Sequence, residues 1–289
     1  MIIAITGSKG FIGQSLIREL EKRAYEYLPI PHEIIIKNDK SLFEIISKAD
    51  VIVNLAGSSI QKRWTRANKF AIYQSRVDTT RKLVKAIASL SSRPKKIISA
   101  SAIGIYDENN IHDEHSRYLS YDFLGKVVRD WESAALFAKN FGLEIYIYRL
   151  GIVLGHSGGI IKKLYPLFNL GLGSTIGNGK QAMSFIHIDD LINIFIDSIE
   201  GKLPENIYNA VSPKYTTNKE FSKVFAKALK KPLIFSIPKY ALNVLYGQGA
   251  NVLYKGQKVL PAHLLEQNFI FKFPSIEDAI NDIVSKFRS

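Results

Sequence analysis

The stretch IIAITGSKGFIGQSLIREL, residues 2–20, decides the fold. Its first residues are apolar or β-branched and predict a buried strand, and from Phe11 the apolar residues recur at the spacing of an amphipathic helix. Between these two elements, Gly7, Gly10 and Gly13 follow the spacing G-x-x-G-x-x-G. Glycine allows a tight turn and close approach of the backbone to a pyrophosphate, while the helix directs free N–H groups at the phosphates. A glycine triplet alone is weak evidence, but this strand–turn–helix context predicts a dinucleotide-binding loop.

Strand and helix patterns continue to alternate after this loop. Further strands are predicted at YEYLPI (25–30), DVIVNLA (50–56), KIISAS (96–101), EIYIYRLGIVL (144–154) and NIYNAV (206–211). Helical periodicity is found at residues 11–23, 66–91, 122–140 and, after a strand end, 186–201. This alternation is typical of a parallel sheet with helices on both faces. We therefore expect an α/β, Rossmann-type doubly wound sheet with a smaller helix-rich C-terminal lobe.

The composition narrows the classes of function. The chain has no cysteine, which excludes disulfides, thiolate metal sites and cysteine nucleophiles. The formal net charge is +13, but the basic residues are scattered. A generally basic surface is therefore favoured over a nucleic-acid site, and a phosphate-rich cofactor would also suit this charge. The sequence shows neither a signal-peptide core nor about 18 unbroken apolar residues, so we expect a cytoplasmic protein without membrane association.

The end of the second predicted strand bears on the choice between NAD and NADP. Sites for NAD usually have an acidic residue there, which binds the ribose hydroxyls. This sequence instead has Pro31 and His32 before Glu33, and Lys9 lies inside the glycine loop, where a cation can meet a 2′-phosphate. NADP is therefore favoured over NAD, and the plain alternative for Lys9 is an exposed loop lysine.

Several motifs in order along the chain resemble one family. TGSKGFIG (6–13), NLAG (54–57), SASAIGIY (99–106) and FIHIDDL (185–191) resemble the extended short-chain dehydrogenase/reductases, the NAD(P)-dependent sugar epimerase/dehydratase group. With KRWT, SRVDTTRKLVKAI, DFLGKVVRDWE, RLGIVLG and the tail GQKVLPAHLLEQNFIFKFPSIEDAI, the chain resembles an atypical branch of that group. This branch is the YfcH-like epimerase family proteins, which end in a C-terminal domain of unknown function. The resemblance covers essentially the whole chain.

The resemblance implies a division of the chain and a cofactor site. The NAD(P)-binding domain would span residues 1–155, with 185–211 returning to it, and the substrate lobe 156–289, with a family-specific tail from about 240. NADP(H) would lie along the strand ends, NLAG on its adenosine side and RLGIVLG near the nicotinamide. Ser101 would match the serine that hydrogen-bonds a substrate. The expected cofactor-binding residues are Gly7, Ser8, Lys9, Gly10, Phe11, Ile12, Gly13, His32, Leu55, Ala56, Gly57, Lys126 and Gly151.

The stretch YLSYDFLGK, residues 118–126, departs from the family's pattern. In that family a tyrosine lies four residues before a lysine, so that both side chains share one helix face and take part in the same proton transfer. Asp122 occupies that position before Lys126, and Tyr121 lies five residues before it. Asp122 could serve as a tuned general acid or base, or it could only pair with Lys126 on a solvated helix flank. Tyr121 could still reach the site if the helix begins at Asp122.

Other residues have both a functional and a plain interpretation. Arg149 ends a strand and could meet substrate or form a structural ion pair, and Tyr106 could line the site or only pack. Trp64 follows the third strand on a loop that could close over a ligand. His187 is expected to be structural, with Asp189 capping the next helix, and no metal site is predicted.

The predicted function is that of an NADP(H)-binding, epimerase/dehydratase-like oxidoreductase for an unknown small polar substrate, with Ser101, Lys126, Asp122 and Tyr121 as catalytic candidates. The alternative is a non-catalytic NADP(H)-binding sensor that interacts with another protein. A nucleic-acid partner is disfavoured. A homodimer through the helices at 66–91 and 122–140 is possible.

Overall fold

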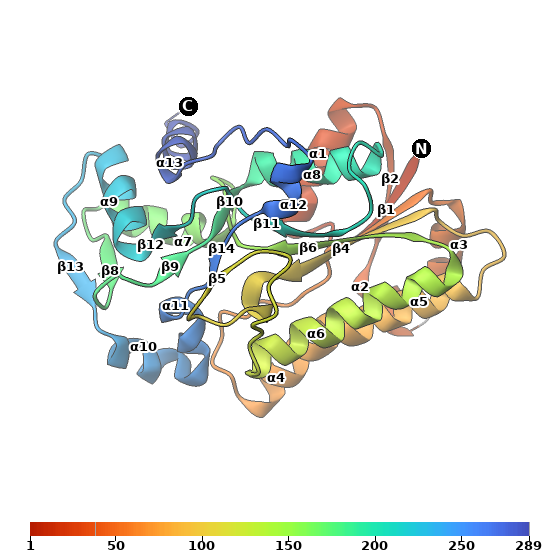
Figure 1. Cartoon of the computed structure of the whole chain (residues 1–289), viewed down its shortest axis with the longest axis horizontal. Helices are drawn as coiled ribbons and strands as arrows, with labels where there is room; N and C mark the ends of the chain where they lie inside the picture. Colours follow the sequence, from red (N-terminus) through yellow and green to blue (C-terminus); the bar gives the residue numbers. More distant parts are fainter. Residues whose placement is uncertain (38, 289) are drawn as a thin grey trace.

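The computed structural model of the 289-residue chain describes residues 1–37 and 39–288. A six-stranded sheet in the order β11-β6-β4-β3-β1-β2 forms its centre, and every neighbouring pair is parallel (Figure 1). Its strands are β1 (Ile2–Thr6), β2 (Glu26–Ile30), β3 (Val51–Asn54), β4 (Lys96–Ala102), β6 (Glu144–Leu150) and β11 (Ile207–Ala210). The chain runs from β1 to β2 and then crosses to β3 on the other side of β1. Ligands of doubly wound sheets bind where the strand order reverses in this way.

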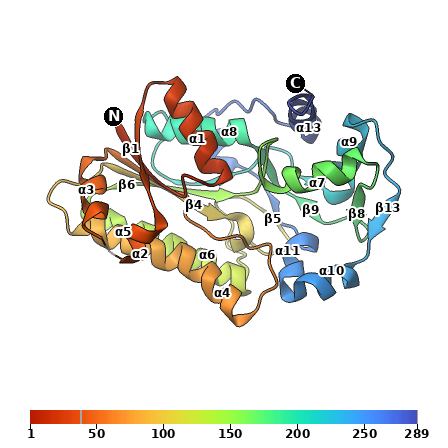
Figure 2. The same cartoon turned by 180° about the vertical axis from the view of Figure 1, so that it is seen from behind.

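Helices cover both faces of the sheet (Figures 1 and 2). α1 (Phe11–Lys22) and α8 (Ile188–Ile199) share one apolar core with the sheet, which includes Ile3, Leu16 and Phe195. On the other face, α3 (Lys40–Lys48), α5 (Thr79–Ala88) and α6 (Phe123–Leu136) contribute to a second core. α2 (His32–Lys37) and α4 (Arg66–Tyr73) lie on this second side. The predicted doubly wound α/β fold is confirmed.

Two predicted elements are interrupted. The helix predicted at 66–91 consists of α4, the π-helical segment η1 (Gln74–Asp78) and α5. The strand predicted at 144–154 divides at Gly151 into β6 and β7 (Ile152–Leu154), and β7 pairs with β10 (Phe185–His187). A Cβ on Gly151 would lie 2.6 Å from the carbonyl oxygen of Ser184, so only glycine fits at this crossing. The short helices α2 and α3 were not predicted.

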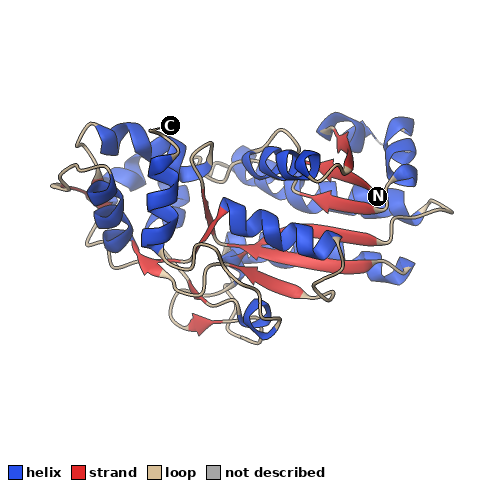
Figure 3. Ribbon diagram, turned by 90° about the horizontal axis from the view of Figure 1, so that it is seen from above, coloured by secondary structure: helices blue, strands red, loops and turns tan. Residues whose placement is uncertain are grey.

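A smaller lobe lies at one end of the sheet (Figure 3). Its core is formed by α7 (Gly159–Asn169), α9 (Asn218–Ala228) and α13 (Ile276–Ser285). Short strand pairs join its loops: β8 (Ser174–Ile176) with β13 (Phe235–Ile237), and β9 (Ala182–Met183) with β12 (Thr216–Thr217). The remaining helical segments are η2 (Ile103–Ile105), η3 (Phe137–Phe141), α10 (Lys239–Tyr246), η4 (Gly247–Ala250), α11 (Asn251–Tyr254) and α12 (Ala262–Glu266).

The last part of the chain returns to the body. β14 (Lys258–Val259) pairs in parallel with β5 (Ile111–His112), and α12 packs against β11. The carboxylate of Asp190 in α8 accepts hydrogen bonds from the N–H groups of Lys272 and Phe273 at 2.8 and 3.0 Å. The tail is therefore bonded to both the sheet edge and a central helix. Within residues 1–37 and 39–288, no helix is long and apolar enough to cross a bilayer.

His187 performs the capping that was expected of Asp189. It is the N-cap of α8, and its Nδ1 accepts a hydrogen bond from the Asp189 N–H at 3.1 Å. The expectation that Asp189 caps the helix is therefore wrong. The imidazole is fully buried, and its Nε2 lies 3.1 Å from a carboxylate oxygen of Asp282 in α13. Burial lowers the pKa of His187 to about 4, although the carboxylates of Asp189 and Asp282 act in the opposite direction.

This buried imidazole makes stability depend on pH. In the unfolded chain His187 gains a proton near its ordinary pKa of about 6.5, whereas in the folded chain it does so only at its lowered pKa of about 4. Between these two pH values the unfolded state therefore binds more protons than the folded state. Stability is therefore lost as the pH falls, by on the order of 3 kcal/mol from this residue. We expect His187→Asn, which keeps a capping oxygen, to flatten the dependence in urea denaturation between about pH 7.5 and about pH 5. The exposed His32→Asn is the control, and equal slopes for His187→Asn and the native chain would contradict the assignment.

Candidate functional site

In the glycine loop, residues 7–13, the backbone packs closely against itself and against Leu55. Gly7 has φ +68°, and a Cβ on it would lie 2.6 Å from the carbonyl oxygen of Leu55. A Cβ on Gly13 would lie 2.4 Å from the carbonyl oxygen of Gly7. Gly10 is the N-cap of α1 and offers no side chain to cap it. The N–H groups of the first helical turn are therefore suited to bind an anion, as the spacing predicts.

A pocket of about 280 Å³ lies beside this loop at the ends of β1 and β3. Predicted residues that line it are Gly7, His32, Ala56 and Gly57. Ser8 and Lys9 lie in the loop, with Lys9 exposed, and Phe11 and Ile12 begin α1 and pack on the core. The Leu55 carbonyl contacts Gly7 as described above. The structure thus brings the glycine loop, the NLAG loop and the end of β2 together, in the arrangement that an adenosine site requires.

A buried polar network joins the far strand ends. Glu132 of α6 receives a bidentate pair of hydrogen bonds from Arg149 of β6, both at 2.8 Å, and a third from the Ser101 hydroxyl at 2.6 Å. Arg149 also donates to the Tyr106 hydroxyl at 2.7 Å, which in turn donates to Asn209 at 2.9 Å. Arg149 is therefore engaged in a structural ion pair, and Tyr106 packs in the interior. Ser101 is 2% exposed and its hydroxyl is directed at Glu132.

A second cavity, of about 210 Å³, opens between the two lobes. Strand ends, the start of α6 and the α11 segment enclose it, and most of its lining is apolar. Gly151 and Asp122 line it, as do Trp64 and Trp131. Ala102 and Ile103 line it as well, whereas Ser101 is not among the lining residues.

The three candidates in YLSYDFLGK have different surroundings. Asp122 is the N-cap of α6, which begins at Phe123, and its Oδ1 accepts from the Gly125 N–H at 2.8 Å. Lys126 pairs with Asp130 at 2.7 Å, so the Asp122–Lys126 pair considered from the sequence is not the one formed. Tyr121 is 89% exposed, with the Arg129 guanidinium 5.2 Å from its ring centre. The structure brings Asp122 to the cavity and leaves Tyr121 and Lys126 outside its lining. The catalytic roles stay predictions.

Three residues of this region were missed from the sequence: Arg76, Trp131 and Glu132. Glu132 follows Val128 by four residues and so continues the apolar stripe of α6. A carboxylate on a buried stripe needs a buried partner, so a buried ion pair or hydrogen bond of Glu132 could have been predicted from the sequence. Arg76 gave no comparable signal, because its position depends on the π-helical segment η1.

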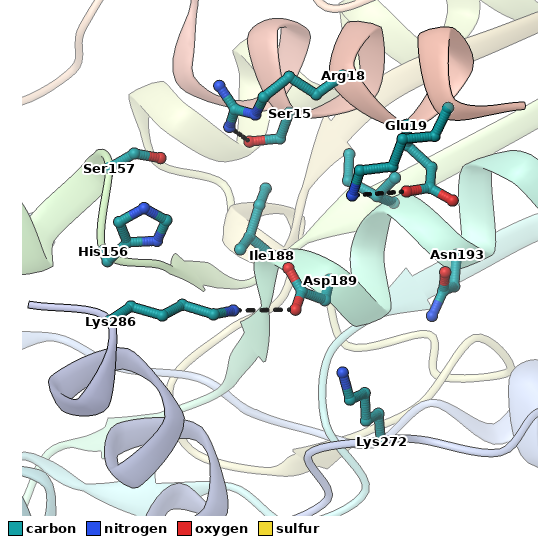
Figure 4. A pocket seen from close by; sticks show the side chains of 12 residues that line it. Ser15, Arg18, Glu19, His156, Ser157, Ile188, Asp189, Asn193, Lys272 and Lys286 are labelled. Carbon is teal, nitrogen blue, oxygen red and sulfur yellow. Dashed lines mark hydrogen bonds and ion pairs between the residues drawn. The ribbon is translucent and has the colours of Figure 1, made fainter. Parts of the chain in front are cut away.

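A separate polar cavity of about 360 Å³ lies on the α1 and α8 side of the sheet (Figure 4). Lys272 and Lys286 of the tail and Arg18 of α1 extend into it. Lys286 lies 3.2 Å from Asp189, and Arg18 donates to Ser15 at 3.0 Å. The contact of Lys286 with Asp189 joins the tail to α8, whereas Arg18 and Ser15 both belong to α1. No predicted cofactor residue lines this cavity.

The Glu132–Arg149 pair is expected to dominate local stability. In Glu132→Gln a buried guanidinium loses its counter-ion, which costs about 3–5 kcal/mol of unfolding free energy. Replacing both partners, as in Glu132→Leu with Arg149→Met, should recover much of this loss because no buried charge remains unpaired. Urea denaturation measures both, with the exposed Glu266→Gln as control. A loss below about 1 kcal/mol for Glu132→Gln would show that the pair is not effectively buried.

Comparisons with known proteins agree with this geometry. The model of the NAD dependent epimerase/dehydratase family matches residues 3–210, and that of a domain of unknown function, DUF1731, matches residues 237–283. The chain is 32% identical to the epimerase family protein SDR39U1 homolog, chloroplastic, of Arabidopsis thaliana, covering 98% of this chain and 87% of that protein. Mouse epimerase family protein SDR39U1 is also 32% identical, covering 99% of this chain and 100% of that protein.

Solved structures show the same likeness. The crystal structure of human epimerase family protein SDR39U1 (isoform 2) with NADPH has a TM-score of 0.89 at 29% identity and covers 99% of each chain. The UDP-glucose 4-epimerase of Thermotoga maritima, solved with UDP-glucose, has a TM-score of 0.82 at 18% identity over 100% of this chain and 99% of that chain, and supports the fold alone. On its motifs, its fold and these matches, the chain belongs to the NAD dependent epimerase/dehydratase family.

Proposed function

We propose that this protein binds NADP(H) and catalyses an oxidoreductase or epimerase-type reaction on a small molecule. The observation that carries the proposal is the glycine loop, where Gly7 and Gly13 leave no room for a Cβ and α1 begins without a side-chain cap. The adjoining pocket at the ends of β1 and β3 suits an adenosine. The human relative at 29% identity, whose crystal structure contains NADPH, supports this assignment.

The preference for NADP rests on charge. The end of β2 is followed by Pro31 and His32, and His32 lines the pocket where an NAD site usually has an acid. Lys9 is exposed in the glycine loop, within the same part of the fold. These residues would favour a 2′-phosphate over free ribose hydroxyls.

The cofactor preference can be tested by titration. We expect the protein to bind NADPH more tightly than NADH, and Lys9→Ala to weaken NADPH binding about 10-fold by removing a charge-assisted contact. NADH binding should change by less than about 2-fold, because NADH has no 2′-phosphate. Nicotinamide fluorescence gives both dissociation constants, with the exposed Lys223→Ala as control. An equal loss for both nucleotides would assign Lys9 to their shared phosphates, and no binding of either would end the proposal.

When bound, NADP supplies hydride exchange at its nicotinamide. The protein would exclude water with the apolar lining of the 210 Å³ cavity and position a proton-transferring group there. Asp122 is the candidate that lines this cavity, and its capping bond to Gly125 fixes its carboxylate. Ser101, whose hydroxyl donates to Glu132, would act only after a change in that bond.

The role of Asp122 can be separated from its capping. Asn caps helices as well as Asp, so Asp122→Asn should stay folded and bind NADPH normally. We expect its turnover to fall by about 100-fold or more, since a positioned acid or base contributes that much. A panel of carbonyl compounds and sugar nucleotides, followed by nicotinamide absorbance, measures turnover, with the exposed Lys223→Ala as the control that keeps activity. Full activity of Asp122→Asn on any substrate found would contradict this role.

A non-catalytic NADP(H) sensor is the second candidate. It is favoured by the aspartate in the tyrosine position and by Lys126, which is bonded to Asp130. In that case NADPH would bind and persist unoxidised with every member of the panel. The homodimer through the helices predicted at 66–91 and 122–140 stays a prediction, and the exposed Phe137, which directly follows α6, supports it.

A further inference from the structure

Arg76 lines the inter-lobe cavity, and no sequence pattern indicated a site role for it. It belongs to the π-helical segment η1, and π-helical turns are frequent at functional sites. Its side chain lines the cavity of about 210 Å³, with the guanidinium carbon 5.5 Å from the centre of the Trp131 ring. A Cβ on Gly57 would lie 3.2 Å from that carbon. Arg76 therefore lies between the NLAG loop and α6, where the cofactor pocket and the cavity approach each other.

The positive charge of Arg76 is not matched by an acid. Its hydrogen bonds go to the carbonyl oxygen of Ile72 at 3.4 Å and the hydroxyl of Ser75 at 3.5 Å. Across residues 1–37 and 39–288, no carboxylate lies within ion-pair distance of it. Burial lowers the pKa of Arg76 to about 10, which still leaves it charged at neutral pH. Arg76 is half-buried, and a half-buried cation without a counter-ion is unfavourable, a cost that an anionic ligand would relieve.

Several other polar groups of the cavity are already engaged. Lys255 pairs with Glu108 at 2.8 Å, and Asp122 caps α6. Ser184 donates to the carbonyl oxygen of Gln257 at 2.9 Å and accepts from the Val259 N–H at 2.9 Å.

The remaining lining of the cavity is largely apolar. It includes Trp64, Ile103, Leu124, Val128 and Trp131. A sugar with hydroxyls on every side would leave many of them unpaired here. The cavity is better suited to an apolar body with a single charge.

We propose that the substrate has an apolar body and one anionic oxygen group, a carboxylate or a phosphate, and that Arg76 binds this group. The proposal rests on the function assigned above and names the substrate class of the same site. The guanidinium presents paired N–H donors that match two oxygens of either group. The Trp131 ring beneath it keeps the guanidinium in place.

The two tryptophans of the chain allow a direct test. Both line this cavity, so intrinsic fluorescence reports its occupancy without the cofactor. The native chain, Arg76→Met and Arg76→Lys are titrated with benzoate, phenyl phosphate and neutral benzamide, with and without saturating NADPH. We expect benzoate or phenyl phosphate to bind the native chain at least about 10-fold more tightly than benzamide. Whichever of the two binds more tightly identifies the anionic group.

The variants separate charge from shape. Arg76→Met should remove the preference for the charged probe while benzamide binding is unchanged, and Arg76→Lys should retain part of the preference. Lys255→Met is the matched control: it removes the other cation of the cavity, which Glu108 already neutralises, and should keep the preference.

Three results would overturn the proposal: equal binding of benzoate, phenyl phosphate and benzamide to the native chain, an intact preference in Arg76→Met, or a loss in Arg76→Met confined to NADPH affinity. The last result would assign Arg76 to the cofactor phosphates. Failure of the proposed NADP(H) function gives a different result. NADPH would then not bind, while the titrations without NADPH would still show a preference for the anionic probe that depends on Arg76.

Discussion

The buried pair of Arg149 and Glu132 is the interaction on which the region between the lobes depends. Two charges removed from water are costly unless each is fully hydrogen-bonded, and here Arg149 donates to Glu132 twice and to Tyr106 once. The network joins β4, β6, β11 and α6, so these elements meet in one relative position. The network also pairs these buried polar side chains with one another. The cavity beside it is largely apolar, and Arg76 enters it without a carboxylate partner among the described residues.

Much of the fold could be predicted from the sequence because its signals are local. Apolar runs bounded by turn residues predicted all six strands of the sheet, and the glycine spacing predicted the loop after β1. What was missed depends on contacts between distant residues. The break at Gly151 reflects a crossing with Ser184, and the cap of α8 is His187 because its ring is held against the tail. Neither contact can be predicted from the local sequence pattern.

The predicted site residues fall into two groups, those that the structure brings together and those that it does not. The residues expected around an adenosine meet at one pocket, because each follows a strand whose carboxyl end lies at the same sheet edge. The candidates in residues 118–126 point in different directions, because the direction of each side chain depends on where α6 begins. Each residue turns the direction by about 100° on a helix, so a start at Phe123 leaves Tyr121 in the preceding loop. Lys126 then meets Asp130, one turn further along.

The pairing of β14 with β5 has a consequence for how the protein is made. The loop that carries β5 leads into the start of α6, yet its strand partner lies near residue 258, far along the chain. A chain emerging from the ribosome forms its N-terminal sheet first. The wall of the inter-lobe cavity that Lys255, Gly256 and Gln257 supply is synthesised only after every strand of the central sheet. A nascent chain would thus present the nucleotide loop well before it could enclose a second molecule, and binding competence would be acquired in two stages.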